Sequence, residues 1–167
     1  MNEAAEPIQL QPIGYVRHGQ PDDVVKESWA EMTARIDVVD ELADGLEKIE
    51  GFSHLIVLYW MHRLREGGRS ILQIKPRGLM RHGLTLDELP QIGVFASDAP
   101  VRPNPIGLTM VELLGREGNT LNVRGLDAFD EAPVLDIKPY TEDRIVAGAR
   151  MAAWHEDLLR KTGAKRV

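Results

Sequence analysis

Residues 51–63 read GFSHLIVLYWMHR and contain the longest apolar run of the chain, residues 55–61. A continuous apolar run of this length between polar residues is typical of a strand that is buried on both faces. The run is far too short to cross a bilayer as a helix. We therefore expect a central strand here, with His54 at its start and His62 just after its end.

Shorter strands are expected on both sides of this central run. Ala34, Ile36 and Val38 alternate with polar residues, which is the period-two pattern of a half-buried strand. The turn-forming pair at residues 118–119 separates two further apolar segments. In all, strands are expected at residues 13–16, 34–38, 55–61, 91–96, 106–114, 121–123 and 134–138.

Helices are expected to be few and short. Asp40 can cap a short helix, and Asp143 can cap a C-terminal helix with an apolar residue about every 3.6 positions. The remaining segments are predicted as a loose tail at 1–10, an irregular segment at 18–29, a loop at 63–76 and one helical turn at 87–89. This pattern favours a mainly β barrel or sandwich over a doubly wound α/β sheet.

Composition narrows the class of protein. The chain has 167 residues and no cysteine, so we expect a single domain, spanning 1–167, without disulfides or thiolate metal sites. Its first residues are acidic and polar and do not resemble a signal peptide, so we expect a soluble cytoplasmic protein that does not enter a membrane. The net charge of -6 argues against nucleic-acid binding. Residues 63–82 carry six basic residues against the single acid Glu66, so this stretch is either a docking loop for a polyanion or a solvated loop.

A proline-rich segment follows at residues 100–107, PVRPNPIG. Its three prolines fix φ and favour extended backbone in the residues that precede them. The result is a stiff loop that holds Arg102 and Asn104. Such a loop suits the wall of a small-ligand site because it loses little entropy on binding, or it is only a rigid connection between strands.

Carboxylates gather in residues 126–140, LDAFDEAPVLDIKPY. The four acids Asp127, Asp130, Glu131 and Asp136 are followed by Lys138 and Tyr140. Clustered acids can bind a cation, pair with arginine or act as a base, but aspartate is also a common turn residue. His54 and His62 lie about 26 Å apart on an extended strand, so they cannot share one metal ion.

Three blocks together resemble the YaeB/TrmO family of tRNA methyltransferases. They are GFSHLIVLYWMHR, GVFASDAPVRPNPIGLT and LDAFDEAPVLDIKPY, and they follow the family's order over roughly residues 13–140. The resemblance implies a small antiparallel β-barrel with a few short helices that binds S-adenosylmethionine as a homodimer, with the cofactor near the subunit interface. It also implies methylation of N6-threonylcarbamoyladenosine beside the anticodon of tRNA.

The resemblance also implies the site residues. Cofactor contacts would fall on His62, Arg63, Asp98, Leu108, Asp127, Asp130 and Glu131. The family's PRQ-type loop is absent, and Ser28 and Trp29 stand near its place, where Trp29 either stacks on adenine or packs in the core. The candidate bases are Tyr140, Asp136 and His62. Phosphates of tRNA would meet Arg65, Arg69, Arg77 and Arg102.

Two departures from the family keep other functions open. Asp98 replaces a basic residue of the family's ATRSP motif, and DGTPV reads DEAPV at residues 130–134. The Asp98 substitution and the net acidity favour an alternative, a non-catalytic module that binds S-adenosylmethionine. A metal-dependent hydrolase using His18, His54 and His62 is disfavoured because no closely spaced ligand set is present, and no metal site is expected.

Overall fold

A computed structural model describes residues 7–163, so the first six residues of the tail predicted at 1–10 lie outside the described residues. The chain divides into two compact units. The barrel unit comprises the described residues up to 63 together with 106–142, and the second unit comprises 64–105 together with the described residues from 143. The single domain expected from the length stays a prediction, and each unit is described by itself.

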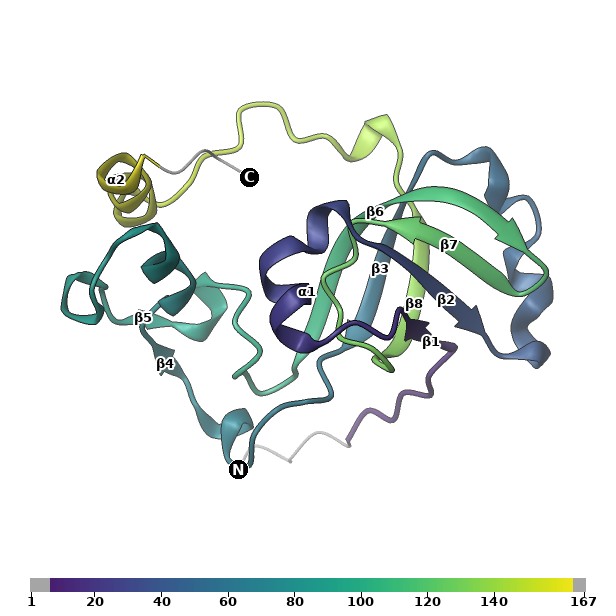
Figure 1. The fold of residues 1–167 in the computed structure, drawn as a ribbon, viewed down its shortest axis with the longest axis horizontal. Helices are drawn as coiled ribbons and strands as arrows, with labels where there is room; N and C mark the ends of the chain where they lie inside the picture. The colour runs from purple at the N-terminus through teal and green to yellow at the C-terminus, as the bar shows by residue number, and fades with distance from the viewer. Residues whose placement is uncertain (1–6, 164–167) are drawn as a thin grey trace, which may run out of the picture. The chain divides into compact units, whose positions relative to one another are not determined.

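The barrel unit is a closed antiparallel barrel of six strands (Figure 1). Its strands are β1 (Gly14–Arg17), β2 (Thr33–Val38), β3 (His54–Trp60), β6 (Ile106–Glu117), β7 (Thr120–Arg124) and β8 (Pro133–Pro139). They close in the order β1-β2-β7-β6-β3-β8. The predicted mainly β fold, a small antiparallel barrel, is confirmed.

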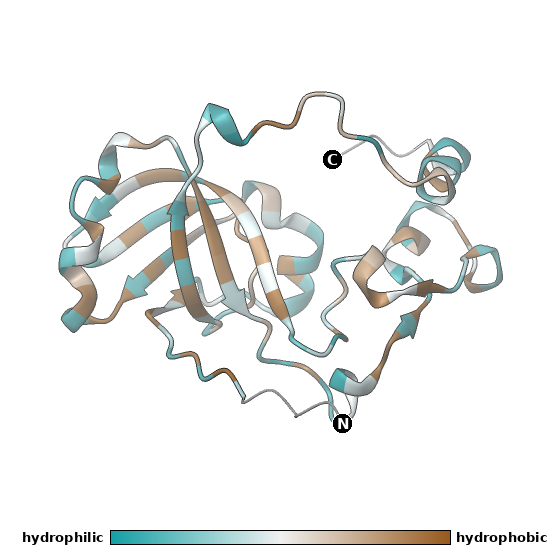
Figure 2. Ribbon diagram, turned by 180° about the vertical axis from the view of Figure 1, so that it is seen from behind, coloured by the Kyte–Doolittle hydropathy of each residue, from teal (hydrophilic) through white to brown (hydrophobic). Residues whose placement is uncertain are grey.

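Barrel closure explains which side chains are buried. Each strand turns one face inward, and the alternating hydropathy along the strands is visible in Figure 2. In β3, Leu55, Val57 and Tyr59 are buried, whereas the residues between them are only partly covered. The prediction that this strand is buried on both faces is therefore wrong, because its second face lies outside the barrel.

Short helices connect the strands of the barrel unit. Residues 18–29, predicted to be irregular, contain helix α1 (Asp22–Ser28) and the 3₁₀ turn η1 (Trp29–Glu31). The helix predicted after Asp40 is present as the 3₁₀ segments η2 (Asp40–Leu46) and η3 (Ile49–Gly51). Asp40 does not cap it, because its carboxylate accepts a hydrogen bond from Asn119 Nδ2 at 2.8 Å.

The second unit consists of short elements. They are η4 (Gly68–Ser70), β4 (Gln73–Ile74), η5 (Arg77–His82), η6 (Leu86–Glu88), β5 (Ile92–Gly93), η7 (Val94–Ala96) and α2 (Ala153–Thr162). β4 and β5 pair as a two-stranded antiparallel sheet. The strand predicted at 91–96 is therefore limited to two residues, because η7 takes up its second half.

The C-terminal helix starts nine residues later than expected, since its cap position is residue 152 and not 143. Asp143 belongs to the 3₁₀ turn η8 (Glu142–Arg144), and helix α2 begins at Ala153. Gly148 between them has a φ of 75°, which is incompatible with a continuous right-handed helix. Leu158 of α2 packs against Leu84 and Leu89 to form the small buried cluster of this unit. Among the described residues, no helix has the length and apolar character needed to cross a bilayer.

Candidate functional site

Arg63 ties the end of β3 to two other segments of the barrel unit. Its guanidinium donates to the carboxylate of Asp22 in α1 and to the backbone carbonyl of Asp130, the latter at 3.2 Å. It also lies 5.8 Å from the centre of the Phe129 ring. Lys26 of α1 lies over the same ring at 5.4 Å. These contacts hold α1 and residues 126–131 beside the end of β3, and the role of Asp22 was missed because residues 18–29 were predicted to be irregular.

Asp130 is held as a charged hydrogen-bond acceptor. Its partial burial disfavours the charged form, but backbone N–H donors of His18 and Gly19 and the nearby His18 and Arg17 outweigh this effect and lower the pKa of the carboxyl group. The His18 N–H donates to its carboxylate at 2.8 Å. The His18 ring in turn contacts the Ala128 carbonyl at 3.1 Å, so this histidine supports the turn.

Asp127 is the point where three distant segments meet. Its carboxylate accepts hydrogen bonds from the hydroxyl of Tyr59 at 2.7 Å and from the hydroxyl of Thr109. Tyr59 lies opposite Gly107 in the β3–β6 pairing. A Cβ at Gly107 would come within 2.2 Å of the Tyr59 ring, so the glycine of the proline-rich segment makes room for this ring. Sequence reasoning missed both hydroxyl donors, because each lies inside an otherwise apolar strand.

His62 has a buried nitrogen that lacks a partner. Its Nε2 accepts from Arg63 Nε at 3.3 Å, so the neutral ring carries its proton on Nδ1. The Nδ1 atom is buried and makes no hydrogen bond within residues 7–163. Burial and the adjacent Arg63 charge lower the pKa of His62, against smaller opposing effects of nearby acids. The ring is therefore neutral at pH 7 and offers an unused N–H donor.

Leu108 and Asp136 lie on the outer face of the barrel. In the strand register, Leu58 of β3 has Leu108 of β6 on one side and Asp136 of β8 on the other. Leu108 is 59% exposed and Met110, two residues on, is 54% exposed. Asp136 forms an ion pair with Lys138 at 2.5 Å. An apolar outer surface thus has a carboxylate beside it.

Tyr140 is separated from His62, another of the candidate bases. Its backbone N–H donates to the His54 carbonyl at 3.0 Å, at the start of β3. Six residues of strand, about 20 Å, separate that end from Trp60, beyond which His62 lies. The structure therefore does not bring Tyr140 and His62 into one site.

The remaining predicted cofactor residues of the barrel unit lie at its periphery. Ser28 and Trp29 follow one another at the end of α1, where Ser28 is exposed and Trp29 is half-buried. Glu131 is exposed and pairs with Arg17 at 3.2 Å. Its φ is 67°, a left-handed conformation that is unusual for a residue with a side chain.

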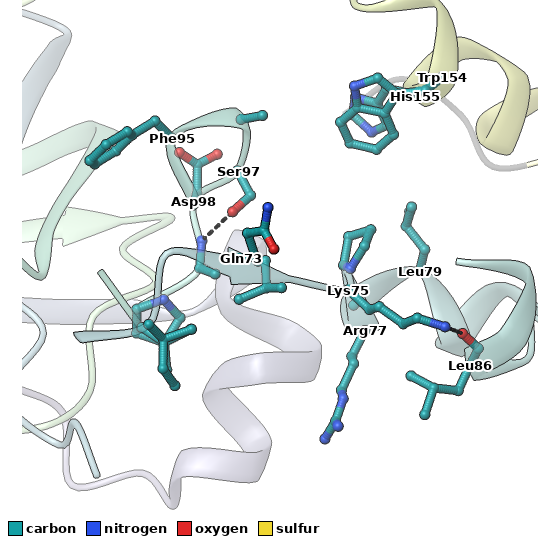
Figure 3. Close-up of a pocket in the computed structure, with 18 of the residues that line it drawn as sticks. Gln73, Lys75, Arg77, Leu79, Leu86, Phe95, Ser97, Asp98, Trp154 and His155 are labelled. Atoms are coloured by element: carbon teal, nitrogen blue, oxygen red, sulfur yellow. Dashed lines mark hydrogen bonds between the residues drawn. The ribbon is translucent and has the colours of Figure 1, made fainter. Parts of the chain in front are cut away.

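The second unit contains the other predicted residues. Asp98, Arg65 and Arg77 line a cavity of about 1330 Å³ (Figure 3). Arg102 donates to the carbonyls of Val94 and Ser97, and Arg69 donates to the Pro103 carbonyl at 2.9 Å. Two of the four predicted phosphate ligands therefore brace the proline-rich loop in this structure. Within residues 7–163, no three His, Cys, Asp or Glu side chains are grouped so that they could hold a metal ion.

Comparison with known proteins agrees with this arrangement. The sequence model of the tRNA-methyltransferase O N-terminal domain matches residues 17–144. A probable S-adenosyl-L-methionine-binding protein of Methanothermobacter thermautotrophicus is 42% identical over 139 residues, which cover 81% of this chain and 92% of that protein. A tRNA (adenine(37)-N6)-methyltransferase of Escherichia coli K12 is 38% identical over 102 residues, which cover 59% of this chain and 40% of the enzyme.

Several relatives are longer than the aligned region. A probable S-adenosyl-L-methionine-binding protein of Archaeoglobus fulgidus is 37% identical over 153 residues, and the chain spans 38% of its length. A solved structure described as the crystal structure of TrmO superposes with a TM-score of 0.66 at 29% identity, over 86% of this chain and 62% of that one.

Proposed function

The chain belongs to the tRNA-methyltransferase O family, and from this premise we propose that it transfers a methyl group from S-adenosylmethionine to N6 of a modified adenosine in tRNA. The observation that carries the proposal is the convergence at Asp127, where Tyr59 and Thr109 bring the three sequence blocks together. The name of the Escherichia coli relative supports adenosine 37 as the acceptor. Within this proposal the acceptor is the threonylcarbamoylated adenosine beside the anticodon.

The residues present fit S-adenosylmethionine. His62 offers a buried N–H without an acceptor, and the exposed Leu108 offers an apolar surface for a ring. The carboxylates of Asp127 and Glu131 suit ribose hydroxyls and a positive charge. When bound, the cofactor supplies an electrophilic methyl group on a positively charged sulfur.

The residues of the barrel act mainly by positioning. Tyr59 and Thr109 fix the Asp127 carboxylate, and Arg63 holds the adjacent turn, so binding requires little rearrangement. Asp136 is the favoured base, because it shares the outer face of the barrel with Leu108, whereas Tyr140 lies at the far end of β3. Its carboxylate would take the proton that the attacking nitrogen loses.

A second copy of the chain and the tRNA complete the proposal. Leu108 and Met110 are apolar and largely exposed on the outer face of β6, which suits a homodimer contact beside the cofactor. Arg65 and Arg77, which line the cavity of the second unit, would meet the phosphates of tRNA. A protein that acts on tRNA in this way would work in the cytoplasm.

Transfer of label tests the function. Purified protein is incubated with S-adenosylmethionine carrying a labelled methyl group and with tRNA that has the threonylcarbamoyl group but lacks the methyl group. We expect label on the nucleoside beside the anticodon, and a slower reaction for Asp136→Asn with unchanged cofactor affinity. Cofactor binding without any transfer would overturn the proposal and favour the non-catalytic module, to which the Asp98 substitution points.

A further inference from the structure

Helix α2 brings two stacked rings to the cavity of the second unit. The rings of Trp154 and His155 lie 5.2 Å apart with an angle of 24° between their planes. Both residues line the cavity of about 1330 Å³ (Figure 3). They follow the segment that the family model matches, residues 17–144.

Trp154 of the stacked pair is held in place by packing, without a ligand. Trp154 packs against the buried cluster of Leu84, Leu89 and Leu158, and Leu79 borders the same cluster. The tryptophan is half-buried, so one part of its surface contacts this cluster while another part lines the cavity. A ring held in this way loses little conformational entropy when a flat ligand stacks on it.

The cavity is also strongly basic. Its lining includes the four cations Arg65, Lys75, Arg77 and Arg81, but only one acid, Asp98. None of these four cations forms an ion pair within the part of the chain that the structure describes. The Lys75 ammonium donates to the Leu86 carbonyl at 2.8 Å, which positions it at the cavity wall. Charge complementarity therefore favours a polyanionic ligand.

We propose that this cavity binds an unpaired nucleotide of an RNA loop, with its base against the Trp154–His155 pair and its phosphates against Arg65 and Arg77. Single-stranded RNA is recognised through bases that stack on aromatic rings and phosphates that meet basic side chains. A paired duplex cannot offer a free base face to the rings. The inference rests on the proposed action on tRNA, and it assigns the recognition of the loop to α2.

Two RNA probes and matched variants test the assignment. The probes are an anticodon stem-loop and a fully paired RNA duplex of the same length, with affinity measured by fluorescence anisotropy. Trp154→Leu keeps an apolar side chain against the cluster of Leu84, Leu89 and Leu158 but removes the stacking ring, so we expect about a tenfold loss of stem-loop affinity. Its duplex affinity is expected to stay unchanged, and Trp154→Phe should retain most of the stem-loop affinity because it keeps a ring.

The basic residues give a different signature. Arg77→Gln should weaken the binding of both RNA probes. It should also lower the slope of the logarithm of affinity against the logarithm of salt concentration by about one. His155→Ala tests the second ring independently of the packing of Trp154 and should weaken stem-loop binding alone. Calorimetric titration of S-adenosylmethionine should be the same for all four variants.

Defined outcomes would overturn the inference. For the ring variants Trp154→Leu and His155→Ala, any of three results would do so: unchanged stem-loop affinity in both, equal losses of affinity for stem-loop and duplex, or weakened cofactor binding in place of weakened RNA binding. If the unaltered protein methylates tRNA while both ring variants match it in stem-loop affinity, only this inference fails. If the unaltered protein binds no RNA and transfers no methyl group, the proposed function fails with it.

Discussion

The barrel unit and the second unit differ in what holds them together. The barrel is closed by strands that pair over long sequence separations, and its interior is a continuous core that runs from Val16 to Val134. Among its described residues, the second unit has one pair of two-residue strands and a small buried cluster formed by Leu84, Leu89 and Leu158. We infer from this difference that the two units have different tasks. The barrel holds the groups proposed to bind the cofactor in fixed positions, and the second unit offers a basic, more adaptable surface for RNA.

Removing one buried leucine from each unit should produce the largest effect and the clearest contrast. Leu55 in β3 is fully buried, and Leu158 in α2 is 5% exposed. Leu55→Ala is expected to lower the free energy of unfolding by about 2–5 kcal/mol, because it leaves a cavity in the barrel. Leu158→Ala should lower the free energy of unfolding by less, because its small cluster can collapse around the gap. Denaturant unfolding measures both.

Hydrogen exchange then locates each effect. Leu158→Ala should speed exchange in residues 77–89 and in α2, while amides of β2 and β3 keep their protection. Leu55→Ala should speed exchange throughout the six strands. Equal loss of protection in both units for Leu158→Ala would mean that the two units unfold as one body, and the contrast drawn above would be wrong.

A methyl group added to one glycine in each unit gives a smaller effect. At Gly107 a Cβ would lie 2.2 Å from the Tyr59 ring, whereas at Gly78 of the second unit no atom lies within 4 Å. Gly107→Ala is expected to lower the free energy of unfolding by about 1–3 kcal/mol, because the tyrosine must move. It should also weaken cofactor binding, because the displaced tyrosine no longer donates to Asp127.

The control variants isolate the clash. Gly115 lies in the same strand as Gly107, but has no atom within 4 Å of an added Cβ. Gly115→Ala and Gly78→Ala should both leave cofactor affinity unchanged. A Gly107→Ala protein with unaltered stability and affinity would show that Tyr59 is not fixed against this glycine.

The same difference between the units explains what the sequence could predict. Strands β2, β3, β6, β7 and β8 follow from alternating or continuous apolar residues, because a barrel imposes that pattern on every strand. Helix α1 was missed because only Val25 of its residues is buried, so it has no apolar periodicity. In the second unit, 3₁₀ turns and two-residue strands have too few residues to show any period.

The sequence predicted which segments form the candidate site, but not which of their residues contact one another. The blocks around His62, Gly107 and Asp127 identify the residues, but register decides that Asp127 meets Tyr59 and Thr109. Register also separates Tyr140 from His62, two of the candidate bases, because they lie at opposite ends of β3. The contact between Tyr59 and Asp127 joins residues 68 positions apart, and such a contact leaves no local trace in the sequence.

Backbone strain gives the smallest expected effect. Glu131, where the family motif has glycine, has a φ of 67°, and its side chain pairs with Arg17. Glu131→Gly and Glu131→Ala both remove this exposed ion pair, which contributes less than about 1 kcal/mol. Only glycine relieves the left-handed strain, so the glycine variant should be more stable than the alanine variant by about 1 kcal/mol. Thermal unfolding of the two variants measures the difference.

The two units differ in which residue types take positive φ angles. Within residues 7–163, the two residues other than glycine with positive φ, Lys48 and Glu131, both lie in the barrel unit. Glu131 stays left-handed because its N–H donates to the Val16 carbonyl at 2.8 Å, so tertiary pairing overrides the local preference. Among the described residues of the second unit, every residue with positive φ is a glycine, as at Gly83. Gly83→Ala should therefore lower the free energy of unfolding by about 1 kcal/mol. If Glu131→Gly and Glu131→Ala were equally stable while Gly83→Ala lost stability, the backbone at residue 131 would not be strained.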